Sequence, residues 1–181
     1  MKDYNIKLNR QFVITMGREY GSGGRTAAKM LAKALKPISA SYDYCLIDTP
    51  PTLGVMNENA LTASDNVIIP MQVEVYALQG TNQLYWFISS IMENSNPALK
   101  ISGILLTRVD ERTNLYKAMK PQFENVAQMM HTKVFKSFIR ETVAVKEVAI
   151  QRGNLFDETP NATATKDYIA FIDEFLNDIT I

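Results

Sequence analysis

The sequence predicts an α/β fold: a three-layer, doubly wound, mostly parallel sheet of about five strands with helices on both faces. Short apolar runs rich in Val and Ile alternate with longer segments of helical periodicity along the 181 residues. Each run is nearly continuous in apolar character, which is typical of strands covered on both faces. A glycine-rich turn follows the first run and opens a helix, as in folds that bind ligands where strands end.

The elements follow from these patterns in order. Strands are expected at 12–16, 44–48, 66–71, 101–107 and 133–139. Helices are expected at about 24–36, 56–63, 77–94, 113–130, 142–151 and 163–178, with Tyr85, Trp86 and Phe87 in the core. Such alternation requires right-handed crossovers between parallel strands. The length and the lack of repeats or linkers predict one domain, residues 1–181.

Composition excludes several classes of protein. Nineteen basic and nineteen acidic side chains cancel, so any nucleic-acid contact must come from a local basic face. The single cysteine, Cys45, excludes an intrachain disulfide framework and a cysteine metal cluster. The polar N-terminus has no secretory apolar core, and no apolar run approaches the roughly 20 residues that span a bilayer. We expect a cytoplasmic protein with no membrane segment.

The stretch GREYGSGGRT, which begins at Gly17, has the form of a phosphate-binding loop between a strand and a helix. Backbone N–H groups there converge on a phosphate at the N-terminus of the helix. The expected phosphate contacts come from Gly21, Ser22, Gly23, Gly24, Arg25 and Thr26. In the usual pattern, G-x-x-x-x-G-K-[ST], a lysine follows the last glycine, and the hydroxyl holds Mg²⁺. Here Arg25 lies one position late, and the alternative is a turn that binds nothing.

Asp48 is the second candidate, because it ends the apolar run at 44–48 and precedes Thr49-Pro50-Pro51. The carboxyl ends of strands form the edge at which α/β folds bind ligands. A carboxylate there can hold a magnesium-bound water, as the Walker B aspartate does, and the alternative is a helix-capping role. With Thr26, Asp48 predicts a magnesium site. The expected cofactors are ATP and Mg²⁺, in a P-loop NTPase-like fold.

Two parts of the chain resemble different families. Residues 12–36, through GREYGSGGR and the amphipathic segment after it, resemble the opening of cytidylate-kinase-like proteins. Residues 42–178 resemble the ParA/Soj partition ATPases through the segments YDYCLIDTPPTLG, NENALTASD, NVIIP, YALQG and ISGILLTRVDERTNL. The two resemblances imply a hybrid or chimera. Its loop unit would be 1–36 and its ParA-like part 42–181, within one P-loop NTPase-like domain.

The ParA/Soj resemblance implies a DNA partition or segregation ATPase that dimerises with ATP. It implies that Thr107 and Asp110 contact the nucleotide base. It also implies non-specific contacts to DNA phosphates, which would come from Arg112, Lys136, Arg140, Lys146 and Arg152. No catalytic residue is assigned.

Departures from the family pattern predict impaired or lost hydrolysis. Glu19 and Gly24 stand where the family has two lysines, and a carboxylate about 4 Å from a phosphate charge costs several kcal/mol. The family segment that supplies a catalytic aspartate between the loop helix and the D-x-P-P strand is absent. Its loss leaves the strand at 44–48 partly exposed, which favours a homodimer.

Three alternatives remain at this stage. A cytidylate-type nucleotide kinase would need a monophosphate pocket and an Arg-rich lid, neither of which is recognisable. A non-catalytic scaffold or engineered chimera would keep the fold without a ligand. A membrane-bound relative would need a basic C-terminal helix. Here Asp167, Asp173, Glu174 and Asp178 are acidic, so we expect this helix to dock on its own sheet.

Overall fold

The computed structural model describes residues 11–15 as backbone, residues 31, 33, 35 and 37, and residues 42–179. The predicted helix at 24–36 lies largely outside these ranges. The chain divides into two compact units, residues 1–65 with 83–99 and residues 66–82 with 100–181. Each unit is considered by itself, and the expectation of a single domain stays a prediction.

The first unit contains a two-stranded parallel sheet. Strand β1 (Gln11–Thr15) pairs with β2 (Tyr44–Asp48) over their whole length. Both strands lie within one residue of their predicted places. Apolar strands pair in this way because the ladder satisfies the backbone N–H and C=O groups that face the neighbouring strand. Leu46 of β2 is 64% exposed. The strand is therefore partly exposed, as the absence of the family segment led us to expect.

Two helices complete the described part of the first unit. They are α2 (Val55–Ala63) and α3 (Thr81–Asn94), whose first two residues belong to the second unit. The Asn96 side chain follows α3 and donates to the carbonyl oxygens of Leu61 at 3.0 Å and Ser64 at 2.6 Å. These bonds satisfy carbonyl groups at the C-terminal end of α2, which have no partner inside the helix.

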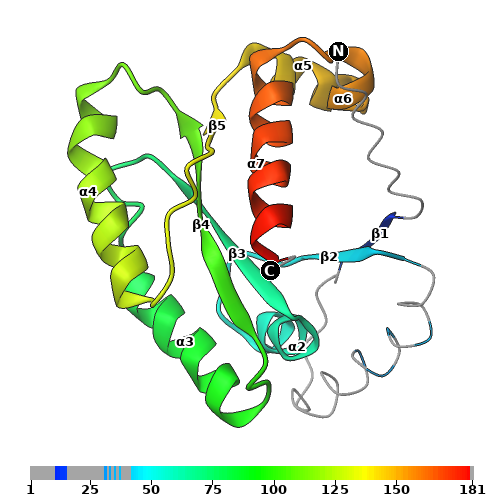
Figure 1. The fold of residues 1–181 in the computed structure, drawn as a ribbon, viewed down its shortest axis with the longest axis vertical. Helices are drawn as coiled ribbons and strands as arrows, with labels where there is room; N and C mark the ends of the chain where they lie inside the picture. Colours follow the sequence, from blue (N-terminus) through cyan, green and yellow to red (C-terminus); the bar gives the residue numbers. More distant parts are fainter. Residues whose placement is uncertain are drawn as a thin grey trace. The chain divides into compact units, whose positions relative to one another are not determined.

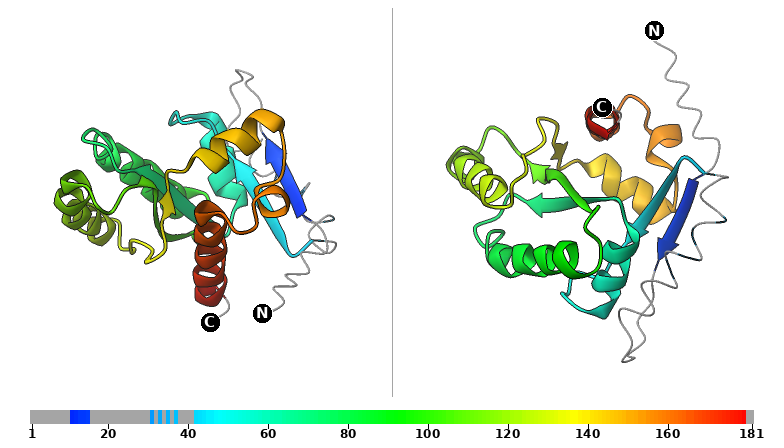
Figure 2. Two further views of the ribbon diagram at one scale, coloured as in Figure 1. Left: turned by 90° about the horizontal axis from the view of Figure 1, so that it is seen from above. Right: turned by 60° about the horizontal axis from the view of Figure 1, so that its bottom comes forward.

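The second unit contains a three-stranded parallel sheet in the order β3-β4-β5. Helices α4 and α7 lie on either side of β4 (Figures 1 and 2). The strands are β3 (Asn66–Gln72), β4 (Lys100–Val109) and β5 (Ile139–Arg140), and the helices are α4 (Asn114–Met129), α5 (Val143–Gln151), α6 (Leu155–Glu158) and α7 (Thr163–Ile179).

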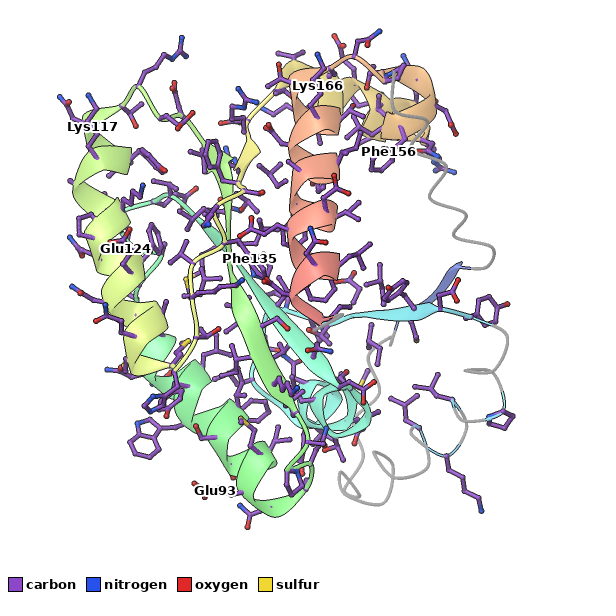
Figure 3. All side chains as sticks on the ribbon, in the orientation of Figure 1. Glu93, Lys117, Glu124, Phe135, Phe156 and Lys166 are labelled. Carbon is purple, nitrogen blue, oxygen red and sulfur yellow. The ribbon has the colours of Figure 1, made fainter. Side chains whose placement is uncertain are left out.

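An aromatic cluster joins α7 to this sheet. Phe135 is 3% exposed and lies between β4 and α7 (Figure 3), with its ring edge-on to Phe171 at 5.1 Å. Leu105 and Ile139 complete the buried cluster, and Ile68, Tyr168, Phe171 and Phe175 pack against it. The prediction that the last helix docks on its own sheet is therefore confirmed. Among the described residues, no helix is long and apolar enough to cross a membrane.

The prediction of a strand at 133–139 is wrong for most of the segment. Val134 forms an isolated parallel bridge with Ile104, and regular pairing resumes only at Ile139. The backbone N–H groups of Lys136 and Ser137 donate to the Glu174 carboxylate at 2.9 and 2.7 Å. Because a side chain of α7 takes these donors, the segment leaves the ladder.

The third helix also differs from its prediction. It begins at Thr81 because residues 75–80 form a turn, which ends at Gly80 with a left-handed φ of 82°. Trp86 is 72% exposed, so its predicted place in the core is wrong. The short helix α6 was not predicted, since four residues are too few to show a period.

Gly103 is a point at which the packing can be tested. A Cβ on this residue would lie 2.6 Å from Cε2 of Phe135, whose ring is held by Phe171 and Phe175. We expect Gly103→Ala to lower the free energy of unfolding by about 1–3 kcal/mol, measured by urea denaturation. In a Phe135→Leu background the same change should cost less, because the smaller side chain leaves room. An equal cost in both backgrounds would contradict this account.

Candidate functional site

The carboxyl ends of β1 and β2 meet at one sheet edge, where the predicted site residue Asp48 lies. Thr15, the last residue of β1, is the parallel partner of Asp48, the last residue of β2. The glycine-rich stretch begins two residues after Thr15. Asp48 is exposed, as a residue that meets a solvated ligand must be. Gly21, Ser22, Gly23, Gly24, Arg25 and Thr26 lie outside the described residues.

The turn after Asp48 is tied to the start of α2. The Asn57 side chain donates to the Pro50 carbonyl oxygen at 3.2 Å, and the Glu58 N–H donates to the Gly54 carbonyl oxygen at 3.0 Å. These bonds and the two prolines restrict the path of the chain beside Asp48. In the described part of the chain, no three His, Cys, Asp or Glu side chains are grouped to hold a metal ion. A single carboxylate suits Mg²⁺, which keeps several waters and takes the phosphates of its substrate as ligands.

In the second unit, the two residues predicted to contact a base lie at the end of β4. The Thr107 hydroxyl donates to the Met71 carbonyl oxygen of β3 at 3.3 Å. Both carboxylate oxygens of Asp110 accept from the Arg112 guanidinium at 2.9 Å. The Arg112 side chain, with help from its backbone N–H, holds the pKa of Asp110 below its usual range. Both residues therefore have partners within the protein, and Asp110 meets a ligand only by sharing or releasing Arg112.

Arg108 is a residue that the sequence reasoning missed. It lies between Thr107 and Val109, where the pairing of β4 with β5 is irregular, and its φ of 54° is left-handed. Such a backbone costs a non-glycine residue about 1–3 kcal/mol. Its guanidinium bonds to Gln72 at 3.1 Å and to Glu141 at 3.2 Å, and it lies 3.5 Å from Glu74. The one available signal was a charged residue inside the apolar run ILLTRV.

Glu141 joins this network to α5. Its carboxylate accepts from Lys146 at 2.8 Å as well as from Arg108, and these two bonds hold the pKa of Glu141 below its usual range. An open depression of about 440 Å³ lies here and has a mixed charge. It is lined by Val109, Asp110, Glu111, Arg112, Arg140 and Glu141.

Three of the five residues predicted to contact DNA are held in ion pairs. Arg112 pairs with Asp110, Lys146 with Glu141, and Arg140 with Asp167, whose side chain is only 8% exposed. The other two, Lys136 and Arg152, make no ion pair within the described residues. Arg152 instead ends α5 in a left-handed conformation, with a φ of 54°.

Comparisons with known proteins relate the chain to one family. A family model described as an AAA domain matches residues 9–101. The sporulation initiation inhibitor protein Soj of Bacillus subtilis (strain 168) is 43% identical over 117 residues, which cover 65% of this chain and 45% of Soj. The chain thus spans about half the length of a relative of this kind.

Solved structures extend the comparison. Apo McdA of Cyanothece has a TM-score of 0.69 at 20% identity, covering 84% of this chain and 59% of McdA, and supports the fold alone. A protein of Borrelia burgdorferi B31 described as a plasmid partition protein, bound to AMPPNP, has a TM-score of 0.62 at 26% identity over 81% of this chain and 55% of its own. Cobyrinic acid a,c-diamide synthase of Mycobacterium smegmatis, with an ATP analog and magnesium, has a TM-score of 0.51 at 36% identity over 54% and 39%. The predicted P-loop NTPase-like α/β fold with parallel strands is confirmed.

Glu141 predicts a pH dependence of stability. Because its pKa is lowered in the folded state, its contribution is present above the unfolded pKa and is lost as pH falls through the folded pKa. We expect Glu141→Gln to lower the urea midpoint at pH 7 relative to Glu147→Gln. Glu147 is a nearby exposed carboxylate that makes no ion pair among the residues that the structure describes. Below the folded pKa of Glu141, where its carboxylate is protonated, the two variants should converge. Equal midpoints at pH 7 would show that the network contributes nothing.

Proposed function

Because this chain belongs to the AAA domain family, in its ParA/Soj-type partition ATPase branch, we propose that it is a partition ATPase-like protein that binds ATP with Mg²⁺ and hydrolyses it poorly or not at all. The observation that carries the proposal is the parallel pairing of Thr15 with Asp48. It supports the proposal because it brings the start of the glycine-rich loop and a free carboxylate to one sheet edge.

The proposed roles follow the positions of the residues. The backbone at Gly21, Ser22, Gly23, Gly24, Arg25 and Thr26 cradles the phosphates, while Thr26 and Asp48 support Mg²⁺. Thr107 and Asp110 contact the base. Solved relatives that hold AMPPNP, or an ATP analog with magnesium, support ATP and Mg²⁺ as the ligands.

Loss of hydrolysis is proposed from the loop sequence. Glu19 and Gly24 occupy the positions at which the family pattern has lysines. Without these cations, the charge that develops on the transferred phosphoryl group lacks its usual stabilisation. Binding can persist, because converging backbone N–H groups hold phosphate without a lysine.

We also propose a homodimer and a non-specific contact with DNA. The exposure of Leu46 on β2 supports association, since an uncovered apolar strand favours pairing with another chain. For DNA, the candidate residues remain Arg112, Lys136, Arg140, Lys146 and Arg152. Their interaction would neutralise phosphates without reading bases, so it would weaken steeply with salt.

The hybrid origin of the chain and its cytoplasmic location stay predictions. The family match begins at residue 9 and so includes 12–36, which favours a single origin over a hybrid with a cytidylate-kinase-like loop. A cytoplasmic location is likewise consistent with the proposed function and awaits its own test.

Nucleotide binding can be measured by thermal unfolding with and without Mg-ATP. Ligand at 100 times its Kd adds about 2.7 kcal/mol, or roughly 5 to 10 °C for a chain of this size. We expect Asp48→Asn to reduce the part of the shift that depends on Mg²⁺. The matched control is Asp43→Asn, because Asp43 is also exposed and precedes the opposite end of β2.

The other outcomes separate the alternatives. A shift with ATP that needs neither Mg²⁺ nor Asp48 would contradict the magnesium site. A shift with CMP and formation of ADP would favour the nucleotide kinase. An unchanged melting temperature with every nucleotide would favour the non-catalytic scaffold. Phosphate release at the rate of active relatives would contradict the loss of hydrolysis.

A further inference from the structure

The segment 133–140 and helix α7 carry opposite charges, and two basic side chains of the segment pair directly with carboxylates of α7. The Lys133 ammonium pairs with Asp178, and the Arg140 guanidinium pairs with Asp167. Between these two pairs, the Glu174 carboxylate accepts from the backbone N–H groups of Lys136 and Ser137. The segment has three cationic side chains, and the facing side of α7 supplies three carboxylates to it.

The spacing on α7 explains how one helix reaches the whole segment. Asp167, Glu174 and Asp178 are separated by seven and four residues, which puts them on one face of a helix of 3.6 residues per turn. The aromatic residues Phe171 and Phe175 anchor that helix against Phe135 of the same segment. The carboxylates are therefore fixed in place by apolar packing and not by their charges alone.

We propose that the carboxylates of α7 act as an internal screen, which neutralises the basic segment 133–140 and lowers its affinity for a phosphodiester polyanion such as DNA. The proposal rests on the proposed function, since it concerns how strongly the DNA-contacting residues act. The three carboxylates occupy the donors that phosphate oxygens would use.

Glu174 occupies its hydrogen-bond donors in the way that a phosphate group would. Its two oxygens each accept from one of two successive backbone N–H groups, an arrangement that also binds phosphate groups. Burial raises the pKa of Glu174, but the hydrogen bonds from Lys136 and Ser137 outweigh it and hold the pKa below its usual range. The Glu174 carboxylate is therefore ionised at neutral pH.

The paired cations remain within reach of a ligand. The side chains of Lys133 and Arg140 are 45% and 43% exposed, so a phosphate can approach them from solvent. The Arg140 guanidinium also interacts electrostatically with the carboxylate of Glu111. Asp178 is 36% exposed and, within the described residues, pairs with Lys133 alone, which makes it the carboxylate that can be neutralised with least structural effect.

The test compares Asp178→Asn with Asp173→Asn in the full chain. Asp173 lies on the same helix and carries the same charge, but its side chain makes no hydrogen bond or ion pair with the described part of the chain. Binding of fluorescein-labelled duplex DNA of mixed sequence is measured by anisotropy with Mg-ATP, at 50 and 200 mM salt. DNA affinity falls when the salt concentration rises from 50 to 200 mM. One added phosphate contact should make the factor of this fall about 3.5 times larger. We expect that increase, and tighter binding at 50 mM, for Asp178→Asn alone.

A second variant shows whether the gain passes through the paired lysine. Asp178→Asn combined with Lys133→Gln should return to the affinity of Asp173→Asn. Equal DNA binding by Asp178→Asn and Asp173→Asn would overturn the proposal, as would a gain that survives the loss of Lys133. Urea unfolding without DNA checks that both single variants fold equally well.

Mg-ATP melts of the same preparations separate this proposal from the proposed function. A thermal shift without DNA binding in any variant would overturn the screen and leave nucleotide binding supported. Tighter DNA binding by Asp178→Asn with a flat melt would support the screen and contradict the nucleotide site.

Discussion

Parallel pairing is the constraint on which the described structure depends. In each sheet all neighbouring strands run in the same direction, so their carboxyl ends meet at one edge and the chain must cross over to return. This places Thr15 beside Asp48 in one unit. In the other, it gathers Thr107, Asp110 and Glu141 where β4 and β5 end. Polar groups cluster at these edges because the strands behind them are filled with apolar side chains.

Charge compensation explains why a chain of zero net charge can contain the basic positions of a DNA-binding family. In the second unit, Arg112, Arg140 and Lys146 each face a carboxylate. The exposed pairs of Arg112 and Lys146 contribute about 0–1 kcal/mol each to stability. The apolar contacts of Phe135 with α7 therefore stabilise the docking of the helix, whereas the ion pairs determine how much positive charge the surface presents.

The sequence pattern within a segment predicted those helices and strands whose formation depends mainly on that segment's own residues. Continuous apolar runs located β1 to β4, and helical periodicity located α2, α4, α5 and α7 to within one or two residues. The segment 133–139 could not be predicted, because its N–H groups bond to Glu174, which lies 37 residues after Ser137 in the sequence. The partners of Arg108 likewise come from two distant segments, around Gln72 and at Glu141. The place of Asp48 at a strand end could be predicted, because it directly follows a continuous apolar run.

Hydrogen–deuterium exchange with and without Mg-ATP tests the proposed nucleotide site at the β1–β2 edge most directly. Backbone amides that contact a ligand, or lie in a turn that it orders, exchange more slowly when it binds. The account predicts slower exchange in the turn from Thr49 to Gly54, and loss of this effect in Asp48→Asn. Unchanged exchange in that turn, under conditions in which ATP raises the melting temperature, would show that the nucleotide binds elsewhere and would contradict the account.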